Sequence, residues 1–136
     1  MGDYFAHWLH IGESADQSKL PKLFYVNWFR KDAGGKFLWP GYGENSRVLA
    51  WVFERCEGDA AAADTAIGRL PTEAALPTDG LTLAGGALAQ LLSVDEHEWR
   101  AELPLIEEHY AVFGDRLPPA LHDELDALAK RLTERS

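Results

Sequence analysis

Residues 30–45 restrict the possible folds of this sequence more than any other segment. Five residues that disfavour regular structure interrupt it: Gly34, Gly35, Pro40, Gly41 and Gly43. We therefore predict a long structured loop. Three aromatic side chains, Phe37, Trp39 and Tyr42, lie in this loop, where burial in a regular element does not account for them.

A helix is predicted directly after the loop. Its apolar residues recur at helical spacing: Val48, Trp51, Val52 and Cys56. Asn45 and Ser46 are favourable N-terminal caps, and Gly58 is a natural stop. We predict a helix over about 46–57, with the loop packed against it. Cys56, the single cysteine of the chain, is interpreted as a small apolar residue of this helix.

Two elements are predicted before the loop. Residues 23–29 are aromatic and β-branched, which favours a buried strand. Phe5, Trp8 and Leu9 lie at helical spacing and predict a short amphipathic helix that ends at about Gly12.

The second half of the chain is predicted to be a helical support. Residues 65–71 form a short edge strand and residues 71–86 are mainly loop. Ser93 and Glu96 have the spacing of a capping box and open a long helix, which Pro104 should bend and which ends at Gly114. A last helix follows Pro118 and Pro119 and carries one apolar stripe: Leu121, Leu125, Leu128 and Leu132.

Charge and aromatic content divide the chain at residue 58. The formal net charge is −9, and residues 59–136 hold fifteen acidic against six basic side chains, whereas residues 1–58 hold seven of each. Twelve of the fifteen aromatic residues lie before residue 59. This balance argues against a nucleic-acid partner, because phosphate binding requires clustered Lys and Arg. Binding by stacking is expected in the first part of a single domain, 1–136.

Neither a membrane nor a metal is indicated. No apolar run approaches the roughly 20 residues that cross a bilayer, and no signal peptide is present at the N-terminus, so we expect a cytoplasmic protein. His7 and His10 lie three residues apart but lack a third ligand, so we interpret them as ordinary, partly buried histidines.

Two stretches resemble a known family. Residues 26–31 (VNWFRK) and 36–49 (KFLWPGYGENSRVL) closely resemble the C-terminal signature of GTP-dependent phosphoenolpyruvate carboxykinases. Residues 2–9, 65–68 and 99–107 are similar to family segments as well. The resemblance implies an α/β (α+β) fragment, mainly helical with a small sheet, from the C-terminal nucleotide-binding lobe.

The resemblance also implies a guanine-binding site. It assigns seven residues to that site: Trp28, Phe29, Phe37, Tyr42, Gly43, Glu44 and Asn45. Phe29, Phe37 and Tyr42 would form an aromatic slot, although many members have Phe at position 42. Asn45 would address the base edge. Read without the resemblance, these rings anchor a loop to the core and Asn45 caps a helix.

Family members convert oxaloacetate and GTP to phosphoenolpyruvate, carbon dioxide and GDP with Mn²⁺ or Mg²⁺. The chain has no G-x-x-x-x-G-K-[ST] sequence for phosphates, and no catalytic or metal-binding residue is assigned to it. We expect a truncated start at Met1, an inert fragment that joins the rest of the same enzyme, and self-association through apolar surface around 24–29. The alternative is a stand-alone protein-interaction module that uses loop 28–45.

Overall fold

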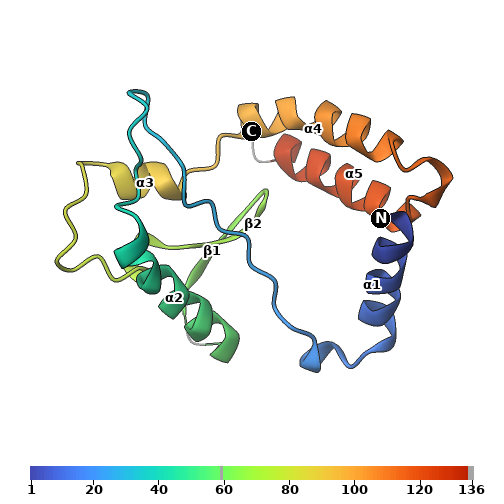
Figure 1. Cartoon of the computed structure of the whole chain (residues 1–136), viewed down its shortest axis with the longest axis horizontal. Coiled ribbons are helices and arrows are strands. Elements are labelled where there is room, and N and C mark those ends of the chain that lie inside the picture. Colours follow the sequence, from blue (N-terminus) through green and yellow to red (C-terminus); the bar gives the residue numbers. More distant parts are fainter. Residues whose placement is uncertain (59, 135–136) are drawn as a thin grey trace. The chain divides into compact units, whose positions relative to one another are not determined.

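The computed structural model describes residues 1–58 and 60–134, which form a mainly helical α+β structure with one small sheet. The predicted fold class is therefore confirmed. In chain order the elements are α1 (Gly2–Ser14), η1 (Gln17–Lys19), η2 (Tyr42–Glu44), α2 (Asn45–Glu57), β1 (Ala62–Thr65), β2 (Gly68–Pro71), η3 (Glu73–Ala75), α3 (Ala87–Leu92), α4 (Glu96–Ala111), η4 (Gly114–Arg116) and α5 (Pro119–Glu134) (Figure 1). Within the described residues, none of the helices combines the length and the apolar character needed to span a bilayer.

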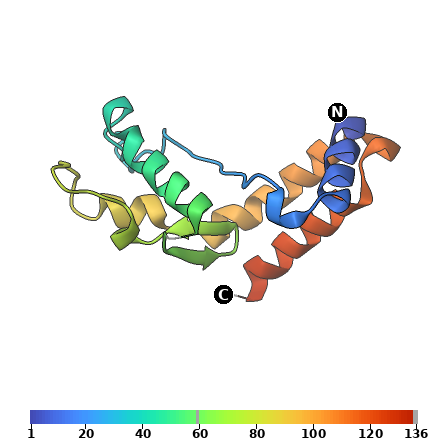
Figure 2. The same cartoon turned by 90° about the horizontal axis from the view of Figure 1, so that it is seen from below.

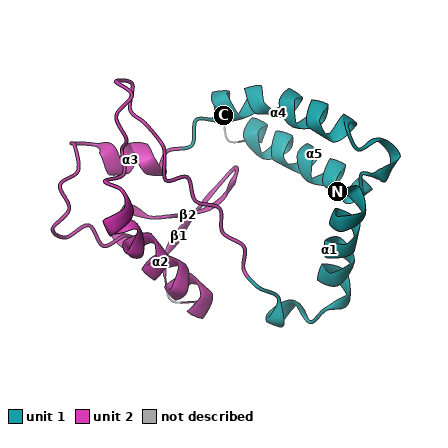
Figure 3. Cartoon of the chain, viewed as in Figure 1, with its two compact units in different colours: residues 1–21, 94–136 teal, residues 22–93 magenta. Residues whose placement is uncertain are grey.

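The chain forms two compact units (Figure 3). Unit 1 contains residues 1–21 and 94–136, and unit 2 contains residues 22–93. Contacts therefore group the chain differently from the composition, which changes at residue 58. The aromatic loop shares unit 2 with the β-hairpin and α3, whereas α1 shares unit 1 with the C-terminal helices.

Unit 1 is held by the pairing of α4 with α5, which lie side by side in both views (Figure 1 and Figure 2). Leu132, on the predicted stripe of α5, is completely buried. The Arg100 guanidinium of α4 donates to the Leu132 carbonyl oxygen from Nε at 3.2 Å and from Nη2 at 3.1 Å. The last helix is therefore confirmed, with its apolar stripe turned towards a neighbouring helix.

The start of α4 differs from the predicted capping box. Asp95 is the N-cap, and its carboxylate accepts from the backbone N–H groups of His97 and Glu98. A carboxylate so close to the first turn satisfies two free N–H groups at once. Ser93, the predicted cap, instead donates its hydroxyl to the carbonyl oxygen of Gln90 at 2.8 Å.

Unit 2 has a small hydrophobic core that includes Trp51 of α2. Trp51, Ala60 and Leu76 are buried together, and the Trp51 indole N–H donates to the Ala61 carbonyl oxygen at 3.1 Å. The predicted helix is confirmed within one residue, and Gly58 ends it in the left-handed conformation. Cys56 lies in this helix, as predicted, and its side chain is exposed.

The β-hairpin lies next in the chain. β1 pairs with β2 in antiparallel register from Ala62–Pro71 to Thr65–Gly68. The predicted strand at 65–71 is only partly right: residues 68–71 form β2, whereas Thr65 ends β1 and residues 66–67 form the turn between them. The rest of β1 was not predicted because its alanine-rich sequence has little strand propensity. Helix α3 was also not predicted, and it lies directly after the predicted loop. Asp59, in the stretch between α2 and β1, lies outside the described residues.

The buried strand predicted at 23–29 is wrong. Residues 23–27 have no regular secondary structure and residues 28–29 form a turn, and within the described residues the segment belongs to no sheet; the nearest pairing is an isolated bridge between Lys31 and Phe37. A strand requires a neighbouring backbone as well as suitable side chains. Phe24 packs edge-to-face on Trp51 with ring centroids 6.1 Å apart, whereas Leu23 and Tyr25 are 92% and 97% exposed.

The first helix is longer than predicted, because α1 continues through Gly12 to Ser14. Gly2 packs so closely that a Cβ there would lie 2.2 Å from the carbonyl oxygen of Arg116, whereas a Cβ at Gly12 would meet nothing within 4 Å. Helix α1 is thus closely packed at Gly2 and has open space beside Gly12.

These two glycines give a matched test of the packing in unit 1. We expect Gly2→Ala to lower the free energy of unfolding by about 1–3 kcal/mol through overpacking. Gly12→Ala should raise it by about 0.5–1 kcal/mol, because alanine loses less backbone entropy in a helix. Urea unfolding followed by helical circular dichroism measures both, and equal effects would contradict the packing described for Gly2.

The exposed apolar side chains of residues 23–25 predict self-association. Leu23→Ser combined with Tyr25→Ser should lower the apparent mass in sedimentation equilibrium at high protein concentration, because it removes exposed apolar surface. Val112→Ser is the control, since Val112 is apolar and exposed in unit 1. A wild-type chain that stays monomeric at every concentration would rule the interaction out.

Candidate functional site

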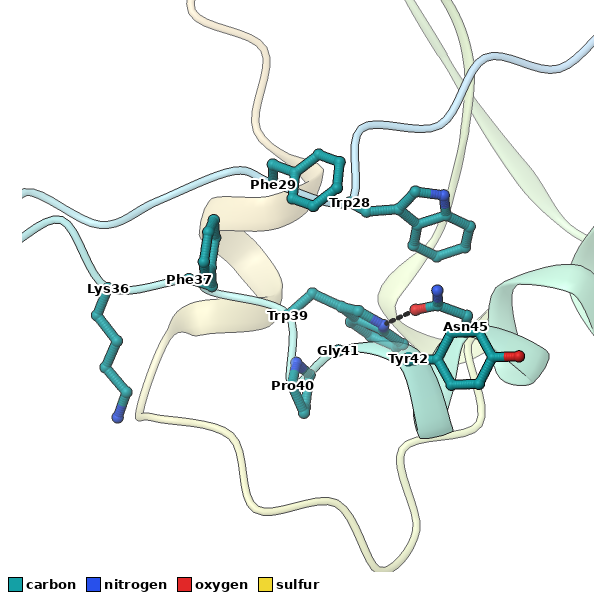
Figure 4. Close-up of a pocket in the computed structure, with 9 residues that line it drawn as sticks. All are labelled: Trp28, Phe29, Lys36, Phe37, Trp39, Pro40, Gly41, Tyr42 and Asn45. Carbon is teal, nitrogen blue, oxygen red and sulfur yellow. Dashed lines mark hydrogen bonds between the residues drawn. The ribbon is translucent and has the colours of Figure 1, made fainter.

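Unit 2 contains a pocket of about 530 Å³ formed by the aromatic loop and the start of α2 (Figure 4). Its walls are mainly aromatic. The lining residues are Trp28, Phe29, Lys36, Phe37, Trp39, Pro40, Gly41, Tyr42 and Asn45. The pocket thus gathers side chains that are up to 17 residues apart in the sequence.

The rings around this pocket differ sharply in burial. Tyr42 is 94% exposed, Phe29 is 71% exposed and Phe37 is 50% exposed, whereas Trp39 is only 6% exposed. Anchoring of the loop to the core therefore explains Trp39 and does not explain the other three. Phe29 and Phe37 contact each other at an angle, with centroids 6.0 Å apart and planes at 62°.

Hydrogen bonds hold the loop in shape. The Asp32 carboxylate accepts from the backbone N–H groups of Gly34 and Lys36, both at 2.9 Å, and closes a tight turn at the tip. Below the tip, the Leu38 N–H donates to the Arg30 carbonyl oxygen at 2.9 Å. The position of Phe37 between these bonds is therefore set by the backbone.

Arg30 ties the base of the loop to the end of α3. Its guanidinium donates to the carbonyl oxygens of Leu91 at 3.2 Å and Ser93 at 2.8 Å, and to the Ser93 hydroxyl at 3.1 Å. A cation is favourable here, because the carbonyl groups at a helix C-terminus carry partial negative charge. The contacts of Arg30 therefore serve the fold.

Asn45 occupies a different role from the cap that its sequence position indicated. Helix α2 begins at Asn45 itself, with Glu44 at the N-cap and no side-chain cap hydrogen bond. The Asn45 carbonyl oxygen Oδ1 accepts from the Trp39 indole N–H at 2.9 Å (Figure 4). The cap prediction was therefore wrong, because the buried indole takes the oxygen that a cap would use.

Five of the seven residues assigned by resemblance line the pocket, and Gly43 and Glu44 do not. The Glu44 carboxylate accepts from Arg47 Nε at 2.6 Å, and Arg47 Nη1 donates to the Pro77 carbonyl oxygen at 2.9 Å. Arg47, which is paired with Glu44, thereby connects the start of α2 to Pro77. Four lining residues were not assigned from the sequence: Lys36, Trp39, Pro40 and Gly41. Their membership of the glycine- and proline-rich loop was the available signal.

Positive charge lies beside the rings. Lys36 lines the pocket, and the Lys31 ammonium lies 5.0 Å from the centroid of the Phe37 ring, a cation–π contact. Among the described residues, no three His, Cys, Asp or Glu side chains form a group that could hold a metal ion. His7 and His10 are both exposed, so their predicted partial burial was wrong.

Comparison with known proteins identifies the family. The family model described as "Phosphoenolpyruvate carboxykinase C-terminal P-loop domain" matches residues 1–131. The chain belongs to the GTP-dependent phosphoenolpyruvate carboxykinases. The carboxykinase of Treponema pallidum (strain Nichols) is 55% identical over 97% of this chain, and those of Arthrobacter sp. (strain FB24) and Neocallimastix frontalis are each 50% identical over 99% and 97% of it.

The match extends over a limited part of these carboxykinases. This chain spans 22% of the length of each of the three relatives. The resemblance inferred from residues 26–31 and 36–49 is confirmed, and it extends through both compact units. The alternative of a stand-alone interaction module has no support, because the relatives reported are all carboxykinases.

Two glycines of the pocket loop provide a test of its backbone. Gly41 has φ 112° and ψ −159°, a conformation that is essentially restricted to glycine. We expect Gly41→Ala to cost about 1–3 kcal/mol of stability or to reshape the loop. Gly43→Ala should change stability by less than about 0.5 kcal/mol, since its Cβ would meet nothing within 4 Å. Urea unfolding and near-ultraviolet circular dichroism report both effects. A Gly41→Ala variant with unchanged stability and unchanged spectrum would contradict the glycine-specific conformation of Gly41.

Proposed function

We propose that this chain is the guanine-nucleotide-binding part of a GTP-dependent phosphoenolpyruvate carboxykinase, a carboxy-lyase. The complete enzyme converts oxaloacetate and GTP to phosphoenolpyruvate, GDP and carbon dioxide, a reaction of gluconeogenesis in the cytoplasm. The observation that carries the proposal is the pocket itself. Five residues assigned to guanine binding by resemblance meet there in a chain of this family: Trp28, Phe29, Phe37, Tyr42 and Asn45.

The pocket has the chemistry that a purine base requires. Three of its rings, Phe29, Phe37 and Tyr42, are exposed, so they are free to stack on a flat ligand, an interaction worth about 1–3 kcal/mol per base. Phe37 is held by the hydrogen bonds on either side of it, which lowers the cost of ordering the site on binding. Lys36 adds a positive charge that attracts the phosphates of a nucleotide.

The chemical step is proposed to belong to the rest of the enzyme. Mn²⁺ or Mg²⁺ would be bound there, since among the described residues no three His, Cys, Asp or Glu side chains form a group that could hold a metal ion. A phosphate-binding sequence of the form G-x-x-x-x-G-K-[ST] is likewise absent from the 136 residues. We therefore expect the isolated chain to bind a nucleotide without converting oxaloacetate, with the remaining carboxykinase chain as its natural partner.

A nucleotide titration tests this proposal. Tryptophan fluorescence of the purified chain should respond saturably to GDP, because Trp28 and Trp39 line the pocket. We expect ADP to bind at least about tenfold more weakly, because a site that hydrogen-bonds one base edge rejects a base with the wrong edge. Asn45→Ala should abolish the preference.

Ser46→Ala is the matched control, since Ser46 is exposed on the same helical turn and does not line the pocket. Equal responses to GDP and ADP in the wild-type chain would contradict guanine recognition. If the Asn45→Ala variant keeps the preference for GDP over ADP, Asn45 does not contact the base edge.

A further inference from the structure

The hydrogen bond between Trp39 and Asn45 decides which arm of the Asn45 amide faces the pocket. An indole N–H is only a donor, and Trp39 is buried, so it requires an acceptor. Oδ1 of Asn45 supplies that acceptor at 2.9 Å. Rotation of the amide by 180° would place an NH₂ group against the indole N–H, leaving two donors facing each other. The amide is therefore fixed in one orientation.

The other arm of the amide is available to a ligand. Within the described part of the chain, Nδ2 of Asn45 has no hydrogen-bond acceptor, and Asn45 lines the pocket. In Figure 4 this nitrogen points away from Trp39, on the side of the amide that faces Trp28. The side chain thus turns its two N–H donors to the pocket, while Oδ1 is directed at Trp39.

We propose that Trp39 is a positioning residue for base selectivity: by taking Oδ1, it makes Asn45 a pure donor that selects purines with an oxygen at position 6. This inference rests on the proposed nucleotide function and specifies how it discriminates. Guanine carries acceptors at O6 and N7 on that edge, whereas adenine carries a donor, the 6-amino group. The 2-amino group of guanine is itself a donor, so Asn45 does not read it. Guanine and hypoxanthine should therefore be treated alike by this pair.

Trp39→Phe tests the inference, because it keeps an aromatic ring and removes the donor. Affinities for GDP, IDP and ADP are measured by isothermal titration calorimetry, which does not depend on the replaced fluorophore. In the variant the amide is free to rotate and can accept from adenine. We expect GDP and IDP to weaken by the same factor, about tenfold, while ADP changes less, so that the GDP:ADP preference collapses.

Two further variants separate positioning from general damage. Trp51→Phe removes an equally buried indole hydrogen bond, the one to Ala61, from the core of the same unit. It should lower stability and leave the GDP:ADP ratio unchanged. Asn45→Asp keeps an acceptor for Trp39 and removes both donors. Its added negative charge weakens the binding of every nucleotide. The ratio of GDP to ADP affinity should nevertheless shift towards ADP, because the 6-amino group of adenine can donate to the carboxylate.

The outcomes distinguish this inference from the function on which it rests. A wild-type chain that binds neither nucleotide, or binds GDP and ADP equally, overturns the proposed function and this inference with it. A selective wild type whose preference survives Trp39→Phe overturns the positioning role alone. A Trp39→Phe effect on GDP that is absent for IDP shows that the 2-amino group is read instead, and also overturns it.

Discussion

The pocket depends on the burial of Trp39. Among the rings that line the pocket, Trp39 is the one that is buried, and its indole N–H donates to Asn45 at the first residue of α2. The bond connects the end of the loop to the start of a helix whose own Trp51 is buried. Phe29, Phe37 and Tyr42 can then remain exposed around the pocket, because the loop does not need them for its attachment.

The sequence predicted the aromatic loop that lines the pocket better than the contacts that its residues make. Glycines and proline at 34–43 predicted the loop, and its aromatic content indicated a stacking surface. Asn45 was interpreted as a helix cap because caps are inferred from local sequence, whereas the acceptor it provides serves a side chain six residues away. Glu44 was assigned to the site by resemblance, and its carboxylate is paired with Arg47. Such pairings depend on the folded geometry, which a local pattern does not specify.

The fold shows the same division between local and non-local information. Helix α5 was predicted correctly because its apolar stripe is contained in one continuous segment. Residues 23–29 have the composition of a strand, but pairing requires a second backbone, and within the described residues none pairs with them. The grouping of the helices also depends on contacts between distant segments. Helix α1 belongs to the same unit as α4 and α5, although 72 residues of the other unit lie between them in the sequence.

Structural and ligand-facing roles are separated within the same few residues. Three charged side chains near the pocket are engaged within the fold. Asp32 and Arg30 bond to backbone groups, and Glu44 pairs with Arg47. Lys36 is the charged side chain in the pocket wall. Asn45 makes the same separation within one amide, since its oxygen serves the fold and its nitrogen faces the pocket. In the proposed site, base recognition would follow from the anchoring of the loop, because the bond that holds Trp39 also sets which group of Asn45 a base would meet.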